Sequence, residues 1–215
     1  MESVALTPLA QGLTDVFFDM DYAILEFYHN LAETAVGRVL SPILTALTYT
    51  AWKGIPLILL SLALMCFRKT RRTGICALMA IAIGALFTNL IIKNAVARPR
   101  PYNFDETLRI WWIYAGAHME SDLSFPSGHM TCACAFTTGF VLTQGKKWLP
   151  VGIIYVVLMG VSRNFLIVHY PSDVLGGFIF GTAAGIIAFF IVRAIYRKWG
   201  QTKFLRENFL HETQK

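Results

Sequence analysis

The sequence predicts an all-α, polytopic bundle of transmembrane helices with five or six spans. Of its 215 residues, 55% are hydrophobic and only 15% are charged, whereas about a quarter of the residues in soluble domains are charged. The mean hydropathy is +0.53, and the chain contains sixteen Phe and five Trp. This composition excludes a disordered chain and a freely soluble globular protein.

Five apolar segments are long enough to cross a bilayer. A helix rises 1.5 Å per residue, so that about 20 residues span the hydrocarbon layer. Three of the segments run for at least nineteen residues without Asp, Glu, Lys or Arg, and the other two reach a spanning length by including their neighbours. The expected spans are 49–67, 73–92, 126–145, 148–167 and 173–194.

The region before the first span has a different character. Five acidic residues and Arg38 interrupt the apolar pattern of residues 15–45, which favours an interfacial amphipathic helix. A sixth span is the alternative. We expect a single membrane domain over 1–215, in which 1–45 form the interfacial helix or a first span, 49–195 the core of spans, and 196–215 a cytoplasmic tail.

The basic residues predict how the chain is oriented. Eleven of the nineteen Lys and Arg residues lie in three groups, which alternating spans bring to one side: Arg68–Arg72, Lys146–Lys147 and the stretch after Arg193. The positive-inside rule makes that side cytoplasmic. We therefore expect a multi-pass protein of the plasma or inner membrane with a cytoplasmic C-terminus. Because the net charge of +6 is explained by these loops, it does not indicate a nucleic-acid partner.

The cysteines give no sign of a metal site or a disulfide. All four lie in or beside expected spans, without a C-x-x-C motif or a histidine at ligand spacing. We interpret them as packing residues: Cys66, Cys76, Cys132 and Cys134.

A second set of charged residues lies on the outward side, where the positive-inside rule disfavours cations. Three cations follow the second span and one ends the fourth, and two histidines and an acid start the third and fifth spans. We infer that this face binds an anion. The residues are Lys93, Arg98, Arg100, Arg163, His129, His169 and Asp173.

Their pattern resembles the signature of the type 2 phosphatidic acid phosphatase (PAP2) family of membrane lipid phosphatases, which shares its active site with vanadium haloperoxidases. That signature has three parts, K-x6-R-P, P-S-G-H and S-R-x5-H-x3-D. Here they run from Lys93 to Pro101, from Pro126 to His129 and from Ser162 to Asp173, complete and in order. The resemblance covers about residues 40–195 and implies a PAP2-type phosphatase core.

Elementary chemistry supports a phosphate site. Phosphoryl transfer spreads negative charge over three oxygens, so fixed positive groups and positioning carry the catalysis. We expect Pro126 in the first turn of the third span, with the backbone N–H groups of Ser127 and Gly128 free to bind phosphate. The expected phosphate-binding cations are Lys93, Arg100 and Arg163.

Two histidines are the expected catalytic residues. We interpret His169 as the nucleophile, with its second ring nitrogen oriented by Asp173. His129, when protonated, would give its proton to the leaving oxygen. The resemblance implies these roles, a phosphohistidine intermediate, and no metal ion or other cofactor, so we expect full activity in a chelator.

The expected activity is metal-independent hydrolysis of a phosphate or diphosphate from an amphiphilic lipid at the outer face of the membrane. The family implies undecaprenyl diphosphate, phosphatidylglycerol phosphate, phosphatidic acid or lipid A phosphate as substrate, and no residue selects among them. A lipid phosphotransferase with the same intermediate and a non-catalytic protein that binds an anionic lipid are the alternatives. The oligomeric state is left open.

The other conspicuous residues receive structural interpretations. Arg98 either holds a headgroup or snorkels to the interface, and Lys53 is expected to snorkel outward, with added charge in the pocket as the alternative. The repeat Gly177-x3-Gly181-x3-Gly185 is expected to pack helices together, and loop 94–125 to cover the site. Three histidines, His29, His118 and His211, are interpreted as structural, and four loop residues as interfacial anchors: Arg109, Trp111, Trp112 and Tyr114.

Overall fold

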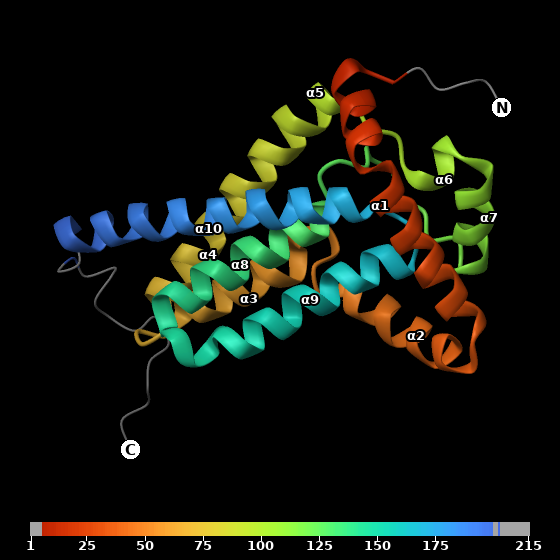
Figure 1. The fold of residues 1–215 in the computed structure, drawn as a ribbon. Helices are drawn as coiled ribbons and strands as arrows, with labels where there is room; N and C mark the ends of the chain where they lie inside the picture. The colour runs from red at the N-terminus through yellow and green to blue at the C-terminus, as the bar shows by residue number, and fades with distance from the viewer. Residues whose placement is uncertain (1–5, 200–201, 203–215) are drawn as a thin grey trace.

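A computed structural model describes residues 6–199 and 202, and in these residues it shows helices and loops but no strand (Figure 1). The predicted all-α class is therefore confirmed. The helices are α1 (Pro8–Glu33), α2 (Ala35–Tyr49), η1 (Trp52–Gly54), α3 (Ile55–Cys66), α4 (Arg71–Leu86), the π-helical turn η2 (Phe87–Ile92), α5 (Lys93–Val96), α6 (Pro101–Phe104), α7 (Glu106–Tyr114), α8 (Gly128–Gln144), η3 (Lys146–Trp148), α9 (Leu149–Phe165) and α10 (Pro171–Trp199).

Helix α8 lies inside the bundle, against α4, α9 and α10 (Figure 1). Small side chains bring α10 close to it. A Cβ atom added to Gly177 would lie 2.7 Å from the carbonyl oxygen of Ser127, and one on Gly181 would lie 2.4 Å from that of Thr131. The predicted role of the glycine repeat in helix packing is thus confirmed, and its partner is a helix of the same chain.

The number of spans differs from the prediction. Four helical stretches of the described residues are long and apolar enough to cross a membrane: Ala35–Cys66, Arg71–Phe104, Lys146–Phe165 and Pro171–Trp199. The expected span 126–145 corresponds to α8, which has 17 residues and a length of about 25 Å, and which is not one of the four. Five or six spans are therefore not confirmed.

The first of these stretches starts earlier than predicted and is broken. It includes α2, which the sequence assigned to the interfacial region, and it breaks at Lys53 and Gly54, whose φ angles are +49° and +74°. Left-handed backbone is ordinary for glycine but costs about 1 kcal/mol or more for other residues. The residues at the break, Ala51, Lys53 and Gly54, line a cavity at one end of the bundle.

Helix α1 crosses the end of the bundle, with α6 and α7 beside it (Figure 1). Its Tyr22 and His29 contact the ring of Trp111, at centroid distances of 5.2 and 4.9 Å. Trp111 and Trp112 are only 8% and 9% exposed, so their predicted role as interfacial anchors is wrong: they fix α7 to α1 and α6. Arg109 and Tyr114 are exposed.

The loops that carry the first two basic groups lie at the opposite end of the bundle, as does the end of α10 (Figure 1). This agrees with the predicted grouping of basic residues on one side. Residues 200, 201 and 203–215, which include most of the expected tail and His211, lie outside the described part of the chain.

The contact between α8 and α10 can be tested with one methyl group. Gly181→Ala should destabilise the protein by about 1–3 kcal/mol, because the added carbon overpacks a backbone contact. Gly12→Ala on α1 is the matched control, since a Cβ there meets no atom within 4 Å. Thermal unfolding in detergent should show a lower midpoint for Gly181→Ala alone, and equal midpoints would contradict this account of the packing.

Candidate active site

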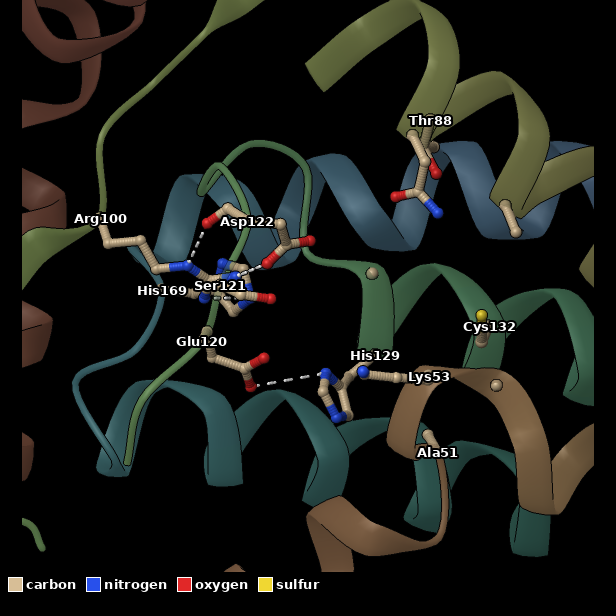
Figure 2. A pocket seen from close by; sticks show the side chains of 14 residues that line it. Ala51, Lys53, Thr88, Arg100, Glu120, Ser121, Asp122, His129, Cys132 and His169 are labelled. Atoms are coloured by element: carbon tan, nitrogen blue, oxygen red, sulfur yellow. Dashed lines mark hydrogen bonds and ion pairs between the residues drawn. The ribbon is translucent and has the colours of Figure 1, made fainter. Parts of the chain in front are cut away.

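The predicted site residues come together at the end of the bundle that α1 crosses. Lys93 begins α5, Arg100 precedes α6, His129 lies in the first turn of α8, and Arg163 lies in the last turn of α9. His169 follows a left-handed residue, Ile167 (φ +53°), that turns the chain back after α9. A cavity of about 220 Å³ lies beside them, and its lining includes Arg100, Glu120, Asp122, Gly128, His129 and His169 (Figure 2). Of the predicted site residues, Lys93, Ser127, Arg163 and Asp173 are not part of this lining.

The ring of His169 is held from both sides. Its Nδ1 atom lies 3.5 Å from Asp173 Oδ2 and 3.5 Å from Ser124 Oγ, and its Nε2 atom lies 3.1 Å from Nη1 of Arg100. A carboxylate can only accept, and a guanidinium can only donate. The neutral tautomer with its hydrogen on Nδ1 satisfies both sides, because its Nε2 lone pair then accepts from Arg100.

The charge state of His169 follows from its surroundings. Burial, and then the neighbouring Arg100, Arg163 and Lys93, lower the pKa of His169 well below its usual range. The side chain is 1% exposed. At neutral pH the imidazole is therefore uncharged, which is the form that acts as a nucleophile.

Asp173 has its own set of donors. Oδ1 accepts from Nη1 of Arg98 at 2.8 Å, and Oδ2 accepts from Ser124 Oγ at 2.5 Å and from the backbone N–H of Tyr170 at 2.9 Å. The carboxylate is fully buried. Three hydrogen bonds fix the orientation of this carboxylate, and they therefore also fix the position of the Oδ2 atom that lies next to His169.

Each of the three predicted phosphate-binding cations is paired with a carboxylate from loop 94–125. Arg163 donates to Glu120, while Lys93 and Arg100 both donate to the side chain of Asp122. Arg100 also donates to the carbonyl oxygen of Val168 at 2.7 Å. Burial alone would raise the pKa of Asp122, but Lys93 and Arg100 outweigh it and lower this pKa to about 2. The expectation that the loop covers the site agrees with these contacts.

His129 faces the same cavity. Its Nδ1 atom lies 4.0 Å from Oε1 of Glu120. Lys53 lines the cavity. This agrees with the alternative expectation of an added charge in the pocket. The side chain is also exposed, so outward snorkelling stays a prediction.

The start of α8 differs from the prediction in two ways. The helix begins at Gly128, so Pro126 precedes it, and the backbone N–H of Ser127 is used, because it donates to the carbonyl oxygen of Asp173 at 3.1 Å. The Ser127 hydroxyl is buried and has no hydrogen-bond partner among the described residues. A Cβ on Gly128 would meet no atom within 4 Å. Gly128 lines the cavity, so an anion there can reach its backbone, whereas Ser127 is fully buried and is not part of the lining.

Sequence reasoning missed several residues that hold the site. Arg98 is neither a headgroup ligand nor a snorkelling residue, since its side chain is 1% exposed and pairs with Asp21 and Asp173. Glu120 and Asp122 were not singled out, although two acids six and four residues before P-S-G-H, in a loop expected to cover three cations, could have indicated their role. Within the described residues, no three His, Cys, Asp or Glu side chains are grouped so that they could hold a metal ion.

Comparison with known proteins decides the family. A family model described as the PAP2 superfamily matches residues 73–197, which is more than half of the chain and includes all three motifs. The chain belongs to the PAP2 superfamily. The resemblance seen in the motifs is therefore confirmed, and the chain is a multi-pass membrane protein of the phosphatase class.

Similar PAP2-type proteins carry phosphatase names. An undecaprenyl-diphosphatase from Bacillus subtilis is 30% identical over 79% of this chain and 83% of its own, and a phosphatidylglycerophosphatase B from the same organism is 29% identical over 74% and 76%. An undecaprenyl-diphosphatase from Sulfolobus acidocaldarius is 32% identical, and the match spans 55% of that protein's length. The crystal structure of a transmembrane PAP2-type phosphatidylglycerolphosphate phosphatase from Bacillus subtilis superposes with a TM-score of 0.62, at 27% identity and over 91% of this chain and 93% of that one.

The pairing of Asp122 with two cations predicts competition with an anion. Asp122→Asn should lower the concentration of inorganic phosphate that half-protects the protein against thermal unfolding, by up to about fivefold, because a half-exposed ion pair is a weak competitor. Glu106→Gln is the matched control: it lies on the same loop and pairs with Arg109 at 3.6 Å, away from the cavity. Unchanged or weaker protection in Asp122→Asn would show that this carboxylate does not compete.

Proposed function

We propose that the protein is a metal-independent phosphatase that releases phosphate from an amphiphilic lipid phosphate or diphosphate through a phosphohistidine on His169. The observation that carries the proposal is the composition of the cavity. Its lining combines His169, His129 and Arg100 with residues of two long apolar stretches of the chain: Ala51, Lys53 and Gly54 from the first, and Ala85, Thr88 and Asn89 from the second.

This arrangement suits a substrate that arrives from the bilayer. The outer surface next to the second stretch is apolar, with Leu86 58% and Leu90 65% exposed. A lipid can keep its chains in hydrocarbon at this height while its phosphate enters the cavity between η1 and η2. A soluble sugar phosphate would gain no binding free energy from the apolar surface at Leu86 and Leu90, because it has no apolar surface to bury.

The chemistry follows from the positions of the two histidines. Nε2 of His169 attacks phosphorus, and the bond from phosphorus to the lipid oxygen breaks. The negative charge of the bound phosphate favours the protonated form of His129, which gives its proton to that oxygen. Asp173 stabilises the positive charge that then forms on His169. Lys93, Arg100 and Arg163 hold the charge on the phosphoryl oxygens once the phosphate has replaced the loop carboxylates. Water attacks phosphorus in the second step, His129 takes its proton, and the bond to His169 breaks.

Phosphate release in EDTA tests the proposal. The purified protein in detergent should release phosphate from at least one of undecaprenyl diphosphate, phosphatidylglycerol phosphate and phosphatidic acid, and His169→Asn should lower the rate by at least about 10³-fold, because the covalent step is lost. His118→Asn is the control, as this histidine lies outside the cavity lining. With ³²P-labelled substrate, an acid-labile, alkali-stable label should appear on the protein and be missing from His169→Asn. Release that EDTA abolishes, or that His169→Asn retains, would refute the mechanism.

The side of the membrane is a separate part of the proposal. We propose that the site faces outward and that the basic loops face the cytoplasm, as the positive-inside rule predicts. In a Cys66→Ser background, a cysteine at Met119, which is 76% exposed, should react with an impermeant maleimide in intact cells. A cysteine at Lys146 should react only after permeabilisation. The reverse pattern would invert the topology.

A further inference from the structure

An acidic residue on α1 contacts Arg98 and the start of α10, although α1 lies outside the region that the family model matches. Asp21 is only 3% exposed, on the same helix face as the buried Leu25. Burying a carboxylate costs several kcal/mol unless it is paired and hydrogen-bonded. A helix face that needed only packing would carry an apolar residue here.

Every contact of Asp21 leads to the start of α10 or to Arg98. Its Oδ1 atom accepts from the backbone N–H of Ser172 at 2.8 Å. Its Oδ2 atom accepts from the hydroxyl of Ser172 at 2.6 Å and from Nη2 of Arg98 at 2.9 Å. Asp21 thus binds the residue directly before Asp173 and also the cation that Asp173 uses.

Arg98 lies between the two carboxylates. Its Nη1 atom donates to Asp173 Oδ1 at 2.8 Å and to the hydroxyl of Ser172 at 2.7 Å, and its guanidinium lies 3.8 Å from the centre of the Tyr170 ring. The planar guanidinium of Arg98 is therefore held in a single orientation by its two carboxylate partners and by the ring on which it stacks. Without Asp21, its second nitrogen would have no charged partner.

Two further features hold α1 in this position. The hydroxyl of Thr7 donates to the carbonyl oxygen of Val96, two residues before Arg98, and Tyr28 packs edge-on against Phe165 at the end of α9. Asp21 is therefore presented by a docked helix.

We propose that Asp21 is a positioning residue for the reaction: it fixes Arg98, and through Arg98 it holds the carboxylate of Asp173 that orients His169. With both carboxylates ionised, the group Asp21–Arg98–Asp173 carries one net negative charge, which favours the cationic ring of the phosphohistidine. Burial raises the pKa of Asp21, and its bonds to Ser172 and Arg98 oppose this shift. Asp21 touches neither His169 nor the phosphate cations Lys93, Arg100 and Arg163, so it acts on the chemical step. This inference rests on the function proposed above.

Steady-state kinetics provides the first test. Asp21→Asn keeps the size of the side chain and removes its charge, and it should lower kcat by roughly 10- to 100-fold, the range for a displaced catalytic group, with KM within twofold of wild type. Asp19→Asn is the control, because Asp19 is exposed on the same helix and should leave both constants unchanged. Asp21→Glu, which restores the charge, should recover part of kcat.

A second variant covers the case in which Asp21→Asn does not fold, as thermal unfolding in detergent would reveal. Ser172→Ala removes the hydroxyl between Asp21 and Arg98 but leaves both charges in place, and a smaller fall in kcat at constant KM is expected. The inference is overturned if a folded Asp21→Asn, or Ser172→Ala in its place, has the kcat of wild type, or if KM rises while kcat does not fall.

A spectroscopic readout separates this inference from the proposed function. The ¹⁵N shifts of the His169 ring, assigned with His169→Asn, report its tautomer. Asp21→Asn should lower the fraction with hydrogen on Nδ1, and Asp19→Asn should not. If wild type releases no phosphate from any lipid, the proposed function fails, and these shifts alone decide whether Asp21 positions His169: a changed tautomer supports the link, and an unchanged one overturns it.

Discussion

The structure depends on the neutralisation of three cations at one end of a helix bundle. Lys93, Arg100 and Arg163 are each no more than 4% exposed, and buried charges of one sign repel each other and lose their hydration. Glu120 and Asp122 compensate them from loop 94–125, and a phosphate group has the same sign of charge as these two carboxylates. The bundle can therefore keep three buried cations at one end only because negative groups of the same chain lie beside them.

Strained backbone is concentrated around this charge cluster. Of the four non-glycine residues with positive φ in the described chain, Ala97 directly precedes Arg98, Ile167 lies two residues before His169, and Lys53 itself lines the cavity. Each costs about 1 kcal/mol or more. The tight turns that they form place Lys53, Arg98 and His169 at this end of the bundle, just beyond regular helices.

Some residues of the site could be predicted from the sequence and others could not, and the difference has a physical basis. Lys93, His129 and His169 were predictable because motif spacing places each at the end of an apolar segment, and segment ends meet at the membrane surface. The role of Asp21 was not, since it depends on how α1 docks over residues more than seventy positions away, and its acidic character even favoured the solvent face of an amphipathic helix. The break at Lys53 was hidden for a related reason: hydropathy measures whether a segment prefers lipid and contains nothing about a local reversal of the backbone.

The π-helical turn η2 sets the angular phase of the chain as it enters the site. An α-helix advances by about 100° per residue, and a π-turn holds one residue more than an α-turn. Directly after η2, Lys93 is buried while its neighbours Ile91 and Asn94 are exposed. Loss of one residue from η2 would preserve the length of the segment within 1.5 Å but rotate Lys93 toward lipid. Insertions and deletions in this helix are therefore constrained by the rotation of side chains about the helix axis more than by the length of the helix.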